Sequence, residues 1–250
     1  MTGSGGLPVP KCGGGCRRRN PEVRNGTLVD QLWTRNCDMV EKFLNTTFIM
    51  TQAQGREGSL ESFKYFSVQD YYYLVETIRH EAFLMAAVTH PSQKDVVSSL
   101  NDSIISINTQ IAFTAEYRHN LTTELGIQPS ILEEKSPNRA IQVYMAWLQS
   151  NIHFGWFAYQ VSRIPCLYGW GEIANKVNEE MSDAARDSMF YKQWVEPNKN
   201  WVYGADLSAH LQDKVELHNN TETFEIYNRI FREAMALEMA FLESANNMRL

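Results

Sequence analysis

From Leu28 onward, apolar residues recur every three or four positions, and almost no stretch shows the apolar–polar alternation of a half-buried strand. Residues 63–89 show this pattern most clearly. If they form one helix, two neighbouring stripes along it are mainly apolar or aromatic, and we therefore expect that helix to be central. The first stripe contains Asp70, Tyr73, Thr77, Leu84 and Val88, and the second contains Tyr71, Leu74, Ile78, Ala82 and Met85. Further helices are expected over residues 28–50, 94–125, 138–161, 165–182, 203–218 and 222–246. The pattern predicts a single all-α domain built as a helical bundle.

The size and charge of the chain limit what it can bind. With 250 residues and 44% hydrophobic residues, it can bury a core without disulfides or a structural metal. Its 23 basic and 29 acidic residues give a net charge of −6, which argues against nucleic acid or an anionic membrane as a partner. A small neutral or cationic ligand fits better. No run of apolar residues is long enough to span a membrane and no secretion signal is recognisable, so we expect a cytoplasmic protein.

The first 26 residues differ from the rest. They are rich in Gly and Pro, include three consecutive arginines and contain few large apolar side chains. We expect residues 1–26 to form a flexible tail and residues 27–250 to form the folded domain. Cys12 and Cys16 lie in this tail, but no second pair of ligands follows at a spacing suited to metal binding.

Asp70 is the one carboxylate in a segment dominated by aromatic rings, residues 65–74. Tyr73 follows three residues later, so both side chains would point the same way from one helix. A buried carboxylate needs partners, which a tyrosine hydroxyl or a ligand amine could supply. A hydrogen bond between packed helices is the alternative, and on these residues alone it is the preferred explanation.

Cys166 follows Pro165, a residue suited to the first turn of a helix. The amides at a helix N-terminus lower the pKa of a nearby thiol and make it a better nucleophile. An inert buried thiol is the alternative, and the residues alone leave both open.

Glu238 interrupts an apolar stripe near the C-terminus, formed by Phe231, Ala234, Met235, Phe241 and Leu242. Burial would favour its protonated form and suit it to acid–base chemistry near neutral pH. Alternatively, the stripe lies at the edge of the bundle and Glu238 reaches solvent or Arg232.

A metal site is not expected. Glu116 and His119 have the Glu-x-x-His spacing of di-iron bundles, but the chain lacks a second such pair, so we expect both at the surface or at the edge of the core.

These segments together resemble the TenA/thiaminase II family of all-α proteins, which has the haem-oxygenase-like fold. The resemblance covers nearly everything after Leu28, and its most specific parts are the Gln-Asp-Tyr-Tyr-Tyr-Leu run beginning at Gln69 and the Pro-Cys pair at Pro165. Weaker matches lie at Phe43-Leu-Asn-Thr-Thr-Phe48, Ser136-Pro-Asn138, Gly171-Glu172, Tyr191-Lys-Gln-Trp194 and Leu237-Glu-Met-Ala-Phe241.

The resemblance implies a hydrolase that needs no cofactor and releases hydroxymethylpyrimidine from aminopyrimidines or thiamin, in thiamin salvage. Cys166 would be the nucleophile and Glu238 its acid–base partner. Asp70 would hold the pyrimidine nitrogen and amino group, Tyr73 would support the Glu238–cysteine network, and Phe241 would wall the ring. The family also implies a homo-oligomer, either a dimer or a tetramer.

Three positions depart from the tyrosines that this family places in its pocket. Ile141 stands at one of them, with Tyr144 one turn later, Trp170 stands at the second, and Asn198 lies near the third. We interpret these changes as a loss of phenol hydrogen bonds and a gain of apolar contact, which can change the preferred substrate.

Two other functions compete with this one. The same fold could serve another substrate or reaction, including an oxidation like that of PqqC, although none of the six histidines lies in the motifs above. The chain could also be a non-catalytic, ligand-binding oligomer.

Overall fold

The computed structural model describes residues 18–86, 93–215 and 221–250, and within these ranges the chain is helical and contains no strand. This confirms the predicted all-α class. The longer helices are α4 (Ser59–Ala86), α5 (Gln93–Thr123), α7 (Arg139–Ile152), α9 (Trp170–Glu180), α11 (Val202–Lys214) and α12 (Thr221–Ser244). The shorter ones are α1 (Leu28–Arg35), α2 (Cys37–Phe43), α3 (Thr47–Ala53), α6 (Pro129–Glu134), α8 (Trp156–Ser162) and α10 (Glu196–Asn198). None of the described helices is long and apolar enough to cross a membrane.

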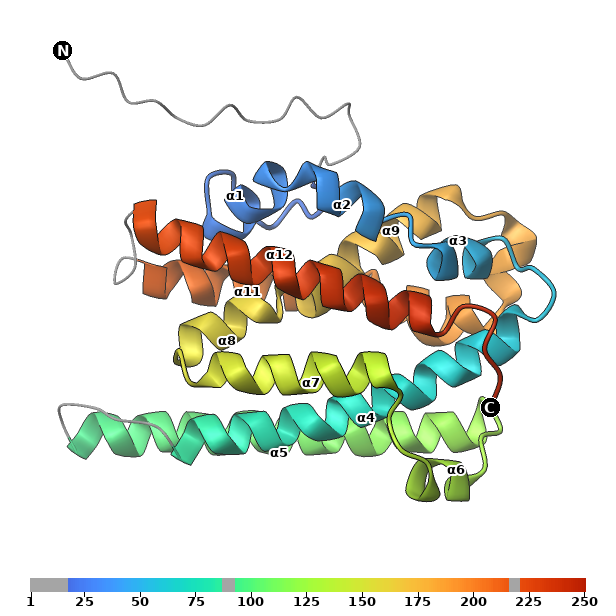
Figure 1. The fold of residues 1–250 in the computed structure, drawn as a ribbon, viewed down its shortest axis with the longest axis horizontal. Helices are drawn as coiled ribbons and strands as arrows, with labels where there is room; N and C mark the ends of the chain where they lie inside the picture. Colours follow the sequence, from blue (N-terminus) through green and yellow to red (C-terminus); the bar gives the residue numbers. More distant parts are fainter. Residues whose placement is uncertain (1–17, 87–92, 216–220) are drawn as a thin grey trace, which may run out of the picture.

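Helices α4 and α5 run side by side as a long pair along one edge of the molecule, and α7 packs between this pair and α12 (Figure 1). Helix α12 also contacts α2, α3 and α8, so one face of the C-terminal helix is packed against the bundle along its length. The face of α4 that carries Asp70, Tyr73 and Thr77 is buried, as expected for a central helix. The second stripe, from Tyr71 to Met85, is only half-buried.

Several expected helices are divided in the structure. The stretch over residues 28–50 forms three short helices, separated at Asn36 and at residues 44–46. The stretch over 138–161 breaks at Gly155, whose φ of 96° is unfavourable for other residues and lies outside the helical region. Periodicity persists through such breaks, because the segments on both sides pack against the same core.

The N-terminal boundary differs from the expectation. Residues 1–17, with Cys12 and Cys16, lie outside the described part of the chain, but residues 18–26 pack onto the bundle instead of forming a tail. Asn20 and Val23 are buried, and the backbone amides of Arg19 and Asn20 donate to the carboxylate of Glu172 at 2.8–3.0 Å. Glu172 also accepts a hydrogen bond from Tyr168 at 2.5 Å. Hydrogen bonds of this kind leave no periodic pattern of apolar residues in the sequence, so the sequence analysis could not predict them.

A π-helical turn, Pro165–Gly169, joins the end of α8 to α9. This turn passes close to the first helices: a Cβ atom on Gly169 would lie 2.7 Å from Cε1 of Phe43, a fully buried ring. Glycine is therefore required there by close packing.

We expect Gly169→Ala to lower the free energy of unfolding by about 1–3 kcal/mol, because Phe43 cannot move without disturbing the core. Gly171→Ala is the matched control, since its Cβ would meet its nearest neighbour at 3.5 Å, an ordinary contact. Chemical denaturation of both variants measures the difference. Equal stability would contradict the proposed close packing at Gly169.

Candidate active site

Four segments of the chain bring most of the expected site residues together in the interior. Helix α4 supplies Asp70 and Tyr73, α7 supplies Ile141 and Tyr144, and α12 supplies Glu238 and Phe241. The π-helical turn supplies Cys166, and Trp170 begins α9 directly after it. Apart from the half-buried Cys166, all of these side chains are at most 8% exposed.

Glu238 is held by an indole. The Nε1 atom of Trp170 donates to Oε1 of Glu238 at 2.8 Å, while Oε2 is buried with no hydrogen-bond partner among the described residues. Burial raises the pKa of Glu238 to about 7, and the neighbouring Tyr144 and Trp170 oppose this rise. The alternative in which Glu238 reaches Arg232 is wrong, because Arg232 pairs with Asp38 on the outer surface.

Asp70 is a second carboxyl group buried in the same interior. Burial raises its pKa to about 8, Tyr117 of α5 partly offsets the rise, and the nearby Glu238 adds to it. The Oδ1 atom has no hydrogen-bond partner among the described residues, and the Tyr117 hydroxyl donates a long hydrogen bond of 3.5 Å to the backbone oxygen of Ser67. A donor pair of a ligand could therefore bind this carboxyl group. Tyr117 was not expected, because its position on α5 shows only after α5 has packed on α4.

The thiol of Cys166 is not activated by its helix in the way the sequence suggested. Burial raises its pKa well above the ordinary value, and the negative charges of Glu238 and Asp70 raise it further, whereas Arg163 and Tyr73 act in the opposite direction. The resting thiol is therefore protonated at neutral pH. Cys166 also lies in a π-helical turn, a feature that often marks a functional position in a helix.

Aromatic rings surround these polar groups. Phe66 stacks on Phe241 with 4.9 Å between ring centroids, and it also lies 6.0 Å from Trp170. The rings of Tyr73 and Tyr144 lie 5.4 Å apart, and both hydroxyls are buried without a hydrogen-bond partner in the described residues. Phe66 has no predicted role, yet it connects the two walls of the site.

The three substituted positions differ in what they do. Ile141 is fully buried, and its amide donates to the side chain of Asn138, which caps α7. Trp170 contributes apolar surface, as expected, and its indole also supplies a hydrogen-bond donor, which it gives to Glu238. Asn198 is turned to the backbone, because its amide donates to the carbonyl oxygen of Trp194 at 2.7 Å.

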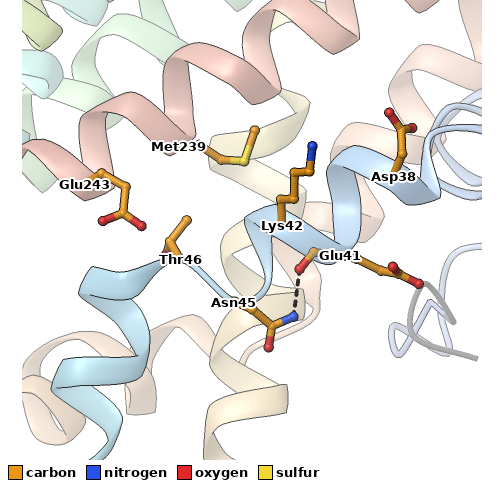
Figure 2. A pocket seen from close by; sticks show the side chains of 7 residues that line it. All are labelled: Asp38, Glu41, Lys42, Asn45, Thr46, Met239 and Glu243. Carbon is orange, nitrogen blue, oxygen red and sulfur yellow. Dashed lines mark hydrogen bonds between the residues drawn. The ribbon is translucent and has the colours of Figure 1, made fainter.

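A surface groove of about 470 Å³ lies apart from this cluster, between α2, the start of α3 and α12 (Figure 2). Its lining residues are Asp38, Glu41, Lys42, Asn45, Thr46, Met239 and Glu243. Met239 directly follows Glu238 but faces the groove, so the two neighbouring side chains point in different directions from α12. Glu116 and His119 are both exposed on α5, as expected.

The two buried carboxyl groups predict an unusual dependence of stability on pH. Their ordinary pKa values are 3.8 and 4.5, whereas in the folded protein they titrate near 8 and 7. The folded state therefore binds more protons than the unfolded state between about pH 4 and 8, so the free energy of unfolding falls as pH rises through this range.

Asp70→Asn and Glu238→Gln, which stay neutral, are each expected to flatten that fall and to raise Tm at pH 8 by about 2–4 °C or more. Thermal melts between pH 5 and 8.5 measure this. Glu233→Gln, at an exposed position of α12, is the control that should follow the parent protein. An unchanged slope in both site variants would show that these carboxyl groups titrate normally.

Comparison with known proteins gives a consistent result. Residues 52–248 match the model of the TENA/THI-4/PQQC family. No curated protein matches the chain.

Solved structures share the fold at low sequence identity. A TenA family transcription regulator from Silicibacter sp. TM1040 has a TM-score of 0.71 at 17% identity, over 88% of this chain and 96% of that one. A TenA homologue from P. horikoshii OT3 has a TM-score of 0.68 at 20% identity, over 88% and 98% of the two chains. A structure described as a TenA-like thiaminase from Sulfolobus solfataricus P2 has a TM-score of 0.62 at 18% identity, over 88% and 94%. Because the family model spans most of the chain and the all-helical fold agrees with it, the chain belongs to the TENA/THI-4/PQQC family.

Proposed function

We propose that this protein is an aminopyrimidine hydrolase of the thiaminase II type, which acts in the cytoplasm on breakdown products of thiamin or on thiamin itself. The observation that carries the proposal is the meeting of a thiol and two carboxyl groups in one interior rich in aromatic rings, Cys166, Glu238 and Asp70. Family membership and the similarity to a structure described as a TenA-like thiaminase support a role connected with thiamin.

The proposed reaction starts with transfer of the Cys166 proton to Glu238. A carboxyl group with a pKa of about 7 can accept a proton and give it back near neutral pH. The thiolate forms a bond to the pyrimidine, and the amine on the exocyclic methylene leaves with the proton from Glu238. Water then supplies the hydroxyl group of the product while the C–S bond breaks and the thiol regains a proton. The net change is the replacement of the amine by a hydroxyl group, and it needs no cofactor.

Asp70 suits the recognition of an aminopyrimidine. One of its oxygens can accept a hydrogen bond from the exocyclic amino group while the other shares a proton with the adjacent ring nitrogen. Because its pKa is about 8, the Asp70 carboxyl group is protonated at neutral pH and can supply the shared proton itself. No neighbouring cation is then needed to balance a negative charge. The rings of Phe66 and Phe241 supply flat apolar surface for the heterocycle.

The test is a chromatographic assay of hydroxymethylpyrimidine released from 4-amino-5-aminomethyl-2-methylpyrimidine and, separately, from thiamin. Cys166→Ala is expected to abolish release while affinity for the pyrimidine is kept. Glu238→Gln is expected to lower kcat by about 10²–10⁴, the usual contribution of a general acid–base group. Glu233→Gln, an exposed carboxyl on the same helix, should retain full activity.

Absence of product with both compounds, despite a folded protein, would contradict the proposal. Binding of the pyrimidine without turnover would then favour a non-catalytic binding protein. Absence of binding would favour another substrate or reaction on the same fold, including an oxidation like that of PqqC.

We also propose that the protein is a homo-oligomer assembled through α5. Among the side chains that the structure describes on this helix, only Thr114 and Leu121 are buried. Val97, Ile104 and Ile111 are 48–65% exposed and lie seven residues apart, the spacing at which one helix packs along another of the same kind. A second copy of this chain supplies such a helix.

Ile104→Lys combined with Ile111→Lys is expected to reduce the mass measured by light scattering towards the 28.8 kDa of one chain. Phe154→Lys, at a highly exposed position between α7 and α8, is the control that should keep the native mass. A monomeric parent protein would refute the oligomer, and an unchanged mass in the double variant would refute the role of α5.

A further inference from the structure

Arg163 is a buried cation close to Cys166. It is 5% exposed and lies immediately after α8. The amide of Leu167 donates to its carbonyl oxygen at 2.9 Å, so a hydrogen bond closes the turn that contains Cys166 and leads into the π-helical turn Pro165–Gly169. Arg163 and Cys166 lie three residues apart within this turn, and the positive charge of Arg163 acts on the thiol of Cys166.

The guanidinium is only partly satisfied by its protein neighbours. Its Nη1 atom forms a buried ion pair with Glu81 of α4 at 2.8 Å, and its Cζ atom lies 5.5 Å from the ring centre of Tyr159. Its Nε atom is buried and has no hydrogen-bond partner among the described residues. The buried Nε donor of a permanently charged group is therefore left for the interior around the thiol.

The other groups that influence the thiol do not supply positive charge. They are carboxyl groups and phenols from the surrounding helices: Asp70 and Tyr73 from α4, Tyr144 from α7, Tyr159 from α8 and Glu238 from α12. His80 of α4 packs edge-on against Tyr159, but burial lowers its pKa to about 4, so it is neutral at pH 7. In the described part of the chain, Arg163 is the cation that opposes the effect of burial on Cys166.

The helix terminus gives little help at this place. Pro165 has no amide hydrogen, and the amide of Leu167 is already bonded to Arg163. Helix α8 ends only one turn earlier, so its C-terminal carbonyl groups oppose the dipole of the helix that follows. At an isolated helix start, free backbone amides would stabilise a thiolate. Here a positively charged side chain can stabilise it instead.

We propose that Arg163 is a positioning residue that stabilises the thiolate of Cys166, and that its ion pair with Glu81 limits this stabilisation. The inference rests on the proposed function only in that Cys166 is the nucleophile. Removing the charge of Arg163 should therefore make the thiol harder to ionise, whereas removing the charge of Glu81 should make it easier. Effects of opposite sign at two paired residues distinguish an electrostatic role from simple packing.

The test measures the rate at which iodoacetamide alkylates Cys166 between pH 6 and 10, followed by mass spectrometry of the peptide that contains it. Arg163→Met is expected to slow alkylation at pH 7.5 by about tenfold, which corresponds to a rise of about one in the pKa of the thiol. Arg163→Lys should recover most of the rate because it keeps the charge. Glu81→Gln should react about threefold faster or more, by the same electrostatic argument.

Arg232→Met is the matched control, because Arg232 pairs with Asp38 on the outer surface and should leave the profile of Cys166 unchanged. Identical profiles for Arg163→Met and the parent would overturn the inference, and so would slower alkylation in Glu81→Gln. If Arg163→Met does not fold, the alkylation rates of Arg163→Lys and Glu81→Gln still test the inference. Alkylation needs no substrate, so a protein without hydrolase activity but with the expected profiles would refute the proposed function and leave this inference standing.

Discussion

The hydrogen bond from Trp170 to Glu238 connects the two parts of the chain on which the site depends. Trp170 stands at the start of α9, directly after the π-helical turn that carries Cys166, and Glu238 lies in the C-terminal half of α12. A carboxyl group inside an aromatic interior is costly unless it is protonated or bonded. The indole satisfies one oxygen, and the raised pKa keeps the group neutral through part of the physiological range. The same bond ties the helix that follows the Cys166 turn to the helix that carries the proposed base.

The environment of each group, more than its type, determines its chemistry here. Asp70 and Glu238 are ordinary carboxylic acids whose burial makes both of them proton carriers near neutral pH. Burial acts in the opposite sense on His80, which loses its charge, and it leaves Arg163 charged because a guanidinium does not give up its proton. The interior around the thiol thus combines neutral acids, a neutral imidazole and a guanidinium whose charge is balanced by Glu81.

The sequence predicted much of this arrangement, and its failures have identifiable causes. Periodicity predicted α4 and α12, because their buried faces repeat over many turns, and the odd polar residues on those faces identified Asp70 and Glu238. Breaks at Asn36 and Gly155 were missed, since the apolar pattern continues across them. Tyr117 and Arg163 were missed because their partners come from other helices, so their importance depends on packing. Local pattern can identify a buried acid, but it cannot say which phenol or cation the fold brings to it.

The contacts of Glu172 have a consequence for the ends of the chain. Arg19 and Asn20 donate their backbone amides to this fully buried carboxylate, which lies only two residues beyond Trp170. Proteolytic removal of the chain through residue 20 would leave this acidic group without two of its donors, in the helix that directly follows the turn carrying Cys166. Residues 19 and 20 therefore help to hold α9 in place, and a protease that trims them would weaken the packing of this helix without cutting any residue near Cys166.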